Sequence, residues 1–279
     1  MDTNETFAGV PIDRVREFWN ARPCNLRHSP KPVGTREYFD EVERRKYFVE
    51  PHIPAFAEFG RWKDRRVLEI GCGLGTDTVS FARAGADVTA IELSDESAAL
   101  ARQRLEVYGL SDRVRIIVGN AEELPALLPV QTFDLVYSFG VIHHSPHPRR
   151  IIEHARRYMT ASSELRLMVY ARISYKLFWI MKEEGIWDMS RIDELIARNS
   201  EAQTGCPVTY TYTDESVREL LDGFHVTDVR KAHIFTWDVD AYKRYDYVKA
   251  PEWANVSDTE LAALERELGW HLLVRAVSR

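Results

Sequence analysis

The stretch Val67-Leu68-Glu69-Ile70-Gly71-Cys72-Gly73-Leu74-Gly75-Thr76 determines the expected fold. Three apolar residues and one carboxylate lead into three glycines at alternate positions, and residues 77–83 continue with helical spacing. This order predicts a buried strand, a tight turn and the start of a helix. Glycine lets the backbone approach a ligand closely, and the free N–H groups at a helix start bind polar or anionic atoms. The stretch therefore predicts a nucleotide-type binding turn.

A second acidic residue indicates a cofactor that contains ribose. Residues 86–91 have the pattern of a second strand, which leads directly into Glu92. A carboxylate about 20 residues after the first glycine, at the end of the next strand, can accept hydrogen bonds from ribose hydroxyls. We therefore expect an adenosine-containing cofactor rather than a turn whose glycines serve packing alone.

The glycine spacing and Glu69 distinguish between cofactors. Dinucleotide sites carry G-x-G-x-x-G, whereas here glycines alternate and Thr76 stands where the third dinucleotide glycine would fall. A carboxylate before the turn would repel a pyrophosphate and attract a cationic cofactor end. This E-x-G-x-G-x-G pattern resembles the first motif of the class I S-adenosylmethionine (SAM)-dependent methyltransferases. The resemblance extends over residues 64–172, and it makes an NAD-dependent oxidoreductase the less favoured alternative.

The resemblance implies a site for SAM, with S-adenosylhomocysteine (SAH) as the product. In the family, the first motif binds the amino-acid end of SAM and the acid after the second strand binds the ribose. The loop after the third strand meets the adenine, and the loop after the fourth faces both cofactor and acceptor. The residues so implied are Glu69, Gly71, Cys72, Gly73, Gly75 and Thr76, then Glu92 and Leu93, then Asn120, Ala121 and Glu122, and finally Ser138, Phe139 and Gly140.

Aromatic residues of the N-terminal region are candidates to cover the cofactor. These are Trp19, Tyr38 and Tyr47. The hydroxyl of Tyr47 could donate a hydrogen bond to the methionine carboxylate. The alternative is that Tyr47 is an aromatic residue on the core face of an amphipathic helix.

Composition restricts the partners and the compartment. The chain has 279 residues and a net charge of −6, which argues against nucleic acid as the substrate. Its three cysteines are widely spaced and odd in number, as is typical of free thiols in a reducing cytoplasm. Residues 1–6 lack the pattern of a signal peptide, and no apolar run approaches the ~18 residues that cross a membrane. We expect a cytoplasmic protein, monomeric or homodimeric, that acts on a small molecule or peptide.

The rest of the chain alternates short apolar strands with helices. This alternation predicts an α/β fold with a parallel sheet covered on both faces. The resemblance implies a seven-stranded, mostly parallel Rossmann-like sheet in the order 3-2-1-4-5-7-6, with the seventh strand antiparallel. The expected strands are 66–70, 86–91, 114–118, 133–138, 164–171, 224–231 and 270–277, and the expected helices are 11–21, 35–49, 51–60, 76–84, 94–108, 121–128, 148–159, 174–185, 191–202, 214–222 and 257–268.

Three aromatic-rich segments lie outside the predicted sheet. We expect residues 1–60 to form a helical N-terminal cap and residues 61–279 to form the methyltransferase core, with lid insertions at about 173–212 and 232–269. Ligands bind at the carboxyl ends of the strands in open α/β sheets. Segments that attach there can enclose an acceptor. The alternative is that their aromatic residues only build a second small core.

The loop after the fourth predicted strand bears on the acceptor. Family members that methylate amide or ring nitrogens often carry an Asn/Asp-Pro-Pro-aromatic motif there, whereas this chain has Ser138-Phe139-Gly140. It resembles the small-molecule O- and C-methyltransferases instead. His143 and His144 stand where a catalytic base would be. Because adjacent side chains diverge, we expect one of them to face the acceptor, and the family favours His143; the alternative is that a histidine only supports the loop.

No metal site is predicted at this loop. His143, His144 and His147 lack a nearby carboxylate or cysteine, and prolines at 146 and 148 restrict the backbone. Zinc sites usually combine such ligands at regular spacing. We therefore expect a site without a metal.

Two arginines and a tyrosine are further acceptor-side candidates. Arg22 and Arg27 lie in the N-terminal loop. Tyr170 lies near the end of the fifth predicted strand, and Arg172 directly follows that strand. Arginine binds carboxylates bidentately, so this set could hold a carboxylate acceptor, which needs no general base. The alternative is a solvated basic face.

The segments 22–28 and 203–210 resemble a bacterial subgroup of small-molecule or peptide methyltransferases, some of which esterify the C-terminal carboxylate of biosynthetic peptides. The resemblance implies methyl transfer to a small-molecule or peptide acceptor in secondary metabolism, by preference to oxygen and possibly to a carboxylate. Two alternatives remain. One is C- or N-methylation of a small metabolite, with His143 as the base, and the other is a non-catalytic regulatory subunit that binds SAM or SAH.

Overall fold

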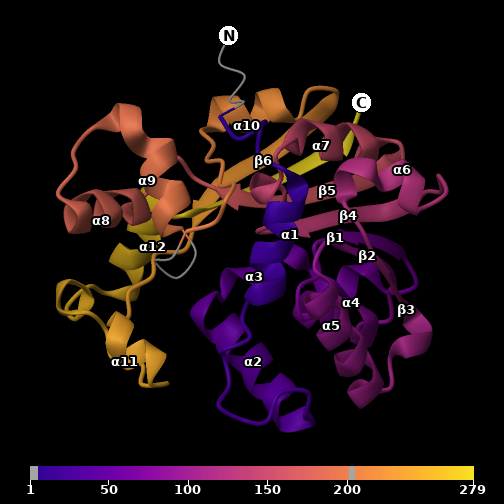
Figure 1. Ribbon diagram of the computed structural model, residues 1–279, viewed down its shortest axis with the longest axis horizontal. Coiled ribbons are helices and arrows are strands. Elements are labelled where there is room, and N and C mark those ends of the chain that lie inside the picture. The colour runs from indigo at the N-terminus through magenta and orange to yellow at the C-terminus, as the bar shows by residue number, and fades with distance from the viewer. Residues whose placement is uncertain (1–5, 201–204) are drawn as a thin grey trace.

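A seven-stranded sheet lies at the centre of the molecule (Figure 1). The computed structural model describes residues 6–200 and 205–279. The strand order is β3-β2-β1-β4-β5-β7-β6, with β1 to β5 parallel and β7 antiparallel to both neighbours. The predicted fold and order are confirmed. The strands are β1 (Arg66–Ile70), β2 (Asp87–Glu92), β3 (Val114–Val118), β4 (Phe133–Phe139), β5 (Met159–Tyr170), β6 (Phe224–Ala232) and β7 (His271–Ser278).

The central strand β1 is covered on both faces, which explains its apolar sequence. It pairs with β2 on one side and with β4 on the other. Val67, Leu68 and Ile70 are almost completely buried, and Glu69 shares this environment with 3% of its surface exposed. Strands inside a parallel sheet bury both faces. The fold therefore places one carboxylate in a poorly solvated position at the carboxyl end of β1.

Helices cover both faces of the sheet. One core cluster packs α6, α7 and α10 against the strands, and another packs α3, α4, α8 and α9. Thr35 and Ser94 cap α2 and α5 by accepting hydrogen bonds from N–H groups three residues later, as N-cap residues do. In the described part of the chain, no helix has the length and apolarity needed to cross a bilayer. The α-helices are α1 (Ile12–Ala21), α2 (Arg36–Val49), α3 (His52–Ala57), α4 (Thr76–Arg83), α5 (Asp95–Tyr108), α6 (Leu124–Leu127), α7 (Pro148–Arg156), α8 (Tyr175–Glu184), α9 (Ile192–Asn199), α10 (Asp214–Leu220), α11 (Val239–Lys243) and α12 (Asp258–Leu268).

Two predicted helices are interrupted. The helix expected at 51–60 stops at Glu58, whose left-handed backbone (φ 50°) separates α3 from the 3₁₀ turn Phe59–Trp62. The helix expected at 121–128 is the 3₁₀ turn Ala121–Glu123 followed by the short α6. Periodicity alone did not reveal either break, because single turns of α- and 3₁₀-helix have similar spacing.

Other boundaries also differ from the sequence-based ones. Strand β5 begins at Met159, before residue 164, and pairs there with Phe133 through an irregular register. Helix α9 ends at Asn199, and residues 201–202 of the predicted helix lie outside the described residues. The short α11 was not predicted, since five residues carry too little periodicity to indicate a helix.

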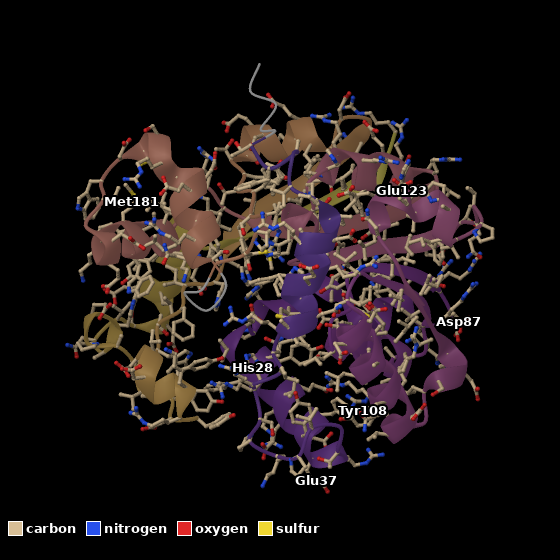
Figure 2. All side chains as sticks on the ribbon, in the orientation of Figure 1. His28, Glu37, Asp87, Tyr108, Glu123 and Met181 are labelled. Atoms are coloured by element: carbon tan, nitrogen blue, oxygen red, sulfur yellow. The ribbon has the colours of Figure 1, made fainter. Side chains whose placement is uncertain are left out.

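The N-terminal cap is attached to the core through α5. Apolar residues of α2 are buried against the turn after β1 and against α5. Arg104 of α5 donates hydrogen bonds to the carbonyl oxygen of Phe39 (3.2 Å) and to Oε2 of Glu43 (3.0 Å) in α2. Tyr108, at the end of α5 (Figure 2), donates to Oδ1 of Asp40 at 2.6 Å. Buried polar contacts therefore fix α2 against the helix that follows β2.

The two inserted segments pack differently. Helices α8 and α9 of the first bury their apolar sides in the same cluster as α3 and α4. In the second, the guanidinium of Arg45 from α2 lies 3.9 Å from the ring centre of Tyr242 and 4.6 Å from that of Tyr245. Arg45 also donates a hydrogen bond to the carbonyl oxygen of Tyr242 (2.6 Å). The first insert thus contributes to the core, and the second packs against the cap.

Candidate active site

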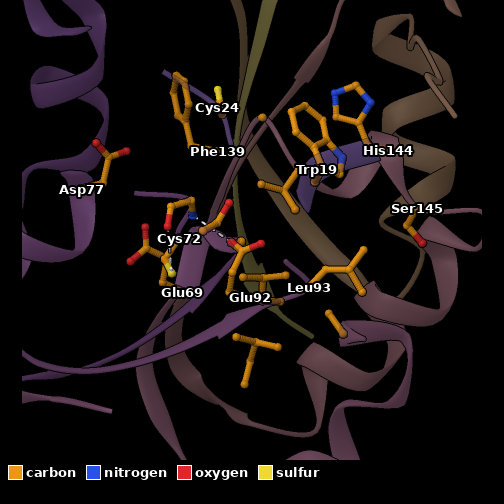
Figure 3. A pocket seen from close by; sticks show the side chains of 18 of the residues that line it. Trp19, Cys24, Glu69, Cys72, Asp77, Glu92, Leu93, Phe139, His144 and Ser145 are labelled. Atoms are coloured by element: carbon orange, nitrogen blue, oxygen red, sulfur yellow. Dashed lines mark hydrogen bonds between the residues drawn. The ribbon is translucent and has the colours of Figure 1, made fainter. Parts of the chain in front are cut away.

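A cavity of about 310 Å³ lies at the carboxyl ends of β1, β2 and β4 (Figure 3). The glycine turn after β1 forms one wall, and the ends of β2 and β3 form a second. Aromatic and histidine side chains from α1, β4, β5 and β7 and the adjoining loops form a third. The lining includes Trp19, Cys24, Asn25, Lys46, Glu50, Glu69, Gly71, Cys72, Gly73, Thr76, Asp77, Glu92, Leu93, Asn120, Ala121, Phe139, Gly140, Val141, His144, Met168, Tyr170 and His271.

The glycine turn is held in shape by the acid after β2. Gly71, Gly73 and Gly75 all have positive φ, at 79°, 52° and 71°, a conformation that strains other residues. Oε2 of Glu92 accepts a hydrogen bond from the N–H of Gly73 (2.8 Å), and Oε1 accepts one from the N–H of Ser94 (2.9 Å). Glu92 therefore connects the turn to the end of β2 while it lines the cavity.

Glu69 is a buried acid on the cavity wall. The hydroxyl of Thr78 donates a hydrogen bond to its Oε2 at 2.6 Å. Burial, together with the nearby charge of Asp77, raises the pKa of Glu69 to about 8. In the free protein Glu69 is therefore mostly protonated at neutral pH, and a cation bound beside it would favour the carboxylate.

Asp77, in the first turn of α4, is the centre of a polar cluster. Lys46 forms an ion pair with its Oδ1 (2.7 Å) and also lines the cavity. The hydroxyls of Tyr47 and Tyr137 donate to its two carboxylate oxygens at 3.0 and 2.9 Å. The hydroxyl of Tyr47 also lies 2.8 Å from Oγ of Ser80. Tyr47 thus lies behind the wall among polar partners, and its neighbour Lys46 presents a cation to the cavity.

Of the two adjacent histidines, His144 faces the cavity and His143 does not. The ring of His144 lies 5.2 Å from that of Trp19, and Figure 3 shows both at the same end of the cavity. Nδ1 of His144 lies 2.8 Å from the carbonyl oxygen of Val208; since a carbonyl only accepts, this contact assigns the ring proton to Nδ1 and leaves Nε2 as an acceptor. His143 is fully buried against Tyr170, neither of its ring nitrogens has a hydrogen-bond partner, and burial lowers its pKa well below the ordinary value.

Three other predicted cofactor residues lie behind the lining. Gly75 is the N-cap of α4. The hydroxyl of Ser138 donates to the carbonyl oxygen of Ile70 (3.0 Å), which connects β4 to β1. Glu122 accepts a hydrogen bond from the hydroxyl of Ser145 (2.5 Å). These residues support neighbours that reach the cavity.

The arginines expected on the acceptor side do not converge on the cavity. The guanidinium of Arg22 lies 5.7 Å from the ring centre of Phe18, and Arg27 is exposed. Arg172 forms an ion pair with Asp193 at 2.6 Å. Residues 24 and 25, between the first two arginines, line the cavity instead. Arg22 and Arg27 themselves are not among the residues that line the cavity.

Sequence reasoning did not indicate several of the lining residues. The polar or polarisable ones from α2, α4, β5 and β7 or beside them include Lys46, Glu50, Asp77, Met168 and His271. Asp77 directly follows the quoted stretch and could have been found from its place at the helix start. The others come from α2, the residue after it, β5 and β7, and no local pattern connects these segments.

Comparisons with known proteins identify the type of domain. A family model described as a methyltransferase domain matches residues 68–165. The ubiquinone biosynthesis O-methyltransferase of Psychrobacter cryohalolentis is 37% identical over 138 residues, which are 49% of this chain and 52% of that protein. The 27-O-demethylrifamycin SV methyltransferase of Amycolatopsis mediterranei is 33% identical over 103 residues, 37% of each chain. The chain thus spans about half or less of the length of these curated relatives.

A solved structure is similar over a longer range. Magnesium protoporphyrin IX methyltransferase from Synechocystis PCC 6803, with bound SAH, superposes with a TM-score of 0.61 at 16% identity. The superposition covers 96% of this chain and 100% of that one. At such low identity the likeness concerns the fold alone.

Proposed function

We infer the reaction from one premise: this chain carries a class I SAM-dependent methyltransferase domain. We propose that it transfers the methyl group of SAM to an oxygen atom of a small-molecule or peptide acceptor. The observation that carries the proposal is a cavity lined both by the glycine turn and by His144, whose Nδ1 lies 2.8 Å from the carbonyl oxygen of Val208. Relatives named as O-methyltransferases support the choice of oxygen, and one that acts on a rifamycin supports a role in secondary metabolism.

The residues on the cofactor side fit SAM. Glu69 offers a carboxylate to a cationic group, and Lys46 offers a cation to a carboxylate. Glu92 would bind the ribose hydroxyls, and Asn120 and Ala121 would contact the adenine; all three line the cavity. A Cβ atom at Gly73 would meet no protein atom within 4 Å, so this glycine faces open cavity rather than packing. SAM would supply an electrophilic methyl group.

The acceptor side favours a hydroxyl group. Methyl transfer needs the attacking oxygen to be aligned, and a hydroxyl must also lose its proton. Nε2 of His144 would take that proton, and the hydrogen bond between Nδ1 and the carbonyl oxygen of Val208 would orient the ring. Among the lining residues in the described part of the chain, Lys46 is the only lysine or arginine. A carboxylate acceptor would therefore have to use Lys46, which is already paired with Asp77.

The direct test is an assay of SAH release with matched acceptor panels. Hydroxylated aromatics, carboxylate-bearing peptides and amines would each be offered with SAM, and the methylated atom would be located by mass spectrometry and NMR. We expect turnover with hydroxylated acceptors. Turnover only with carbon or nitrogen acceptors would contradict O-methylation. If the protein binds SAM but releases no SAH with any acceptor or with cell extract, the non-catalytic alternative is favoured. Binding of NAD in preference to SAM would reject the proposal.

Replacing Gly71 with alanine should weaken SAM binding about 30-fold, or about 2 kcal/mol. The positive φ of Gly71 strains any other residue, and the added Cβ would overlap the side chain of Val141 on the opposite wall. Gly109→Ala is the matched control, because Gly109 also has positive φ (67°) but has no atom within 4 Å of the added Cβ. Calorimetry should show unchanged SAM affinity for the control. Equal losses in both variants would mean that backbone strain, not the shape of the turn, explains the effect.

SAM affinity should increase with pH up to about pH 8. The pKa of Glu69 is about 8 in the free protein, and a bound cation should lower it, so binding releases a proton below pH 8. By this linkage, binding at pH 7 should be about tenfold weaker than its limit above pH 8. The measurement is calorimetry in buffers of different ionisation enthalpy. The amino group of SAM titrates in the same range, so the difference from Glu69→Gln isolates Glu69; identical proton release by both proteins would contradict the assignment.

A further inference from the structure

Three histidines and a carboxylate lie close together beside the cavity. Glu50 follows α2, His52 begins α3, His233 follows β6 and His271 begins β7. Glu50 and His271 line the cavity. One possible ligand atom each from Glu50, His233 and His271 lies within 4.8 Å of the others. The fold thus gathers two imidazoles and a carboxylate from three separate segments.

The orientation of His271 suits a metal ligand. Its Nε2 lies 3.6 Å from Oε1 of Glu50, while its Nδ1 lies 3.0 Å from Nε2 of His52. One nitrogen thus points to the carboxylate and the other is held by a hydrogen bond. Metal-bound histidines commonly have their second nitrogen fixed in this way, which sets the tautomer and the ring orientation.

The backbone at His233 gives independent support. His233 has a left-handed conformation (φ 70°), which is unfavourable for a residue with a side chain. The N–H of Trp270 donates to its carbonyl oxygen (2.8 Å), and the N–H of Ile234 donates to Oε1 of Glu265 (3.1 Å). Such strain concentrates at ligand clamps and active sites. Here it directs an imidazole to within 4.7 Å, between ring centres, of His271.

We propose that Glu50, His233 and His271 bind a divalent first-row transition metal, with an open coordination position toward the cavity. Two imidazoles and one carboxylate are a donor set used for catalytic zinc and for non-haem iron. In a tetrahedral site with Zn–N bonds of about 2.0 Å the ligand atoms lie about 3.3 Å apart, so side-chain rotations must bring these three closer. Sequence spacing around His143 did not indicate the cluster, because its members are distant in the chain.

On the function proposed above, the metal would bind and polarise the acceptor. The ring of Phe139, the last residue of β4, lies 5.6 Å from that of His271, and both residues line the cavity. An acceptor oxygen at the open position would lose its proton more readily. The metal and His144 would then act on the same acceptor.

Cobalt titration of the metal-stripped full chain tests the site without SAM or acceptor, so its outcome is independent of methyl transfer. Absorption spectroscopy and calorimetry should show one equivalent of Co²⁺, with Zn²⁺ competing. Glu50→Gln and His271→Ala should each weaken binding at least 100-fold. His52→Ala should weaken it 10- to 100-fold, as loss of a supporting hydrogen bond does. His225→Ala, at an exposed position of β6, is the matched control and should bind like the wild type.

Two outcomes would overturn the proposal. One is the absence of stoichiometric Co²⁺ binding by the wild type, and the other is equal binding by wild type and Glu50→Gln. Circular dichroism would establish that each variant is folded. If His271→Ala fails to fold, Glu50→Gln decides the question, because Glu50 is partly exposed at a helix end. A wild type that binds SAM but no cobalt would reject the metal site and leave the methyltransferase proposal intact.

Discussion

Replacing Arg104 with methionine should lower the free energy of unfolding by about 3 kcal/mol. Its guanidinium has no exposed surface and donates hydrogen bonds to three acceptors in two other helices. The acceptors are Oγ1 of Thr76 at the start of α4 (2.7 Å), the carbonyl oxygen of Phe39 and the carboxylate of Glu43, both in α2. Methionine fills much of the volume but leaves these acceptors without their donor, and the loss of a buried charged partner costs more than the loss of apolar contact.

Arg102→Met is the matched control for this prediction. Arg102 lies two residues earlier on α5 and is exposed, with one hydrogen bond to the carbonyl oxygen of Ile116 (3.2 Å). Surface substitutions of this kind usually change stability by about 0.5 kcal/mol or less. Urea unfolding followed by fluorescence would measure both variants. Similar values for the two proteins would show that Arg104 does not hold the cap to the core.

The Arg104→Met variant should also bind SAM more weakly than the wild type under conditions in which both proteins are folded. Thr76 lines the cavity, and α2 carries Lys46 on the same wall. If the cap moves away from the first turn of α4, Thr76 and Lys46 no longer have the arrangement in which they line the cavity. Calorimetry below the unfolding transition should therefore show reduced affinity, whereas a folded variant with normal affinity would separate the cap from the cofactor site.

The fold, and the side of the cavity formed by the glycine turn, Glu69 and Glu92, could be predicted because their sequence patterns are local. Residues 67–76 carry strand, turn and helix start together, and Glu92 follows at the end of the next strand. In a parallel sheet the carboxyl ends of neighbouring strands meet at one edge, so these signals combine without further information. The structure brings Glu69, the turn and Glu92 to one cavity.

The differences from the sequence-based expectations concern which of two adjacent residues lines the cavity. In α2 the sequence favoured Tyr47, yet Lys46 reaches the lining. Successive residues on a helix point about 100° apart, so the choice depends on how α2 is rotated against α4 and α5. Contacts distant in the chain, such as Arg104 with Glu43, set that rotation. No pattern within α2 contains this information.

The same reason explains the preference for His143 over His144. Both lie in the 3₁₀ turn Ile142–His144, where adjacent side chains diverge by about a third of a turn. The carbonyl oxygen of Val208, more than sixty residues away, fixes the ring that lines the cavity. The sequence gives even less indication of the cluster of Glu50, His233 and His271, because these residues come from three separate segments beside α2, β6 and β7.

Replacing His144 with asparagine should lower kcat at least 100-fold with hydroxyl acceptors, the usual range for loss of a general base. The amide NH₂ of asparagine can still donate to the carbonyl oxygen of Val208, as Nδ1 of His144 does. The substitution removes Nε2, the atom assigned to take the acceptor proton. SAM affinity should remain within about threefold of the wild type, because the substitution leaves the glycine turn and its hydrogen bond to Glu92 unchanged.

His143→Leu is the matched control on the same turn. His143 does not line the cavity, and its two ring nitrogens have no hydrogen-bond partners. Removing buried polar atoms that lack partners is close to neutral or stabilising, so this variant should keep kcat within about threefold and unfold at the same or a higher temperature. Single-turnover assays would compare both variants at saturating SAM.

A series of acceptors with different pKa values distinguishes a general base at His144 from a residue that only positions the acceptor. A phenol that is already ionised at the assay pH needs no base, so the deficit of His144→Asn should shrink toward the wild-type rate as the pKa of the acceptor falls. If His144 only positions the acceptor, the deficit should stay constant across the series. Loss of activity in His143→Leu with normal turnover by His144→Asn would reverse the assignment, and it would return the base to the histidine that the sequence favoured.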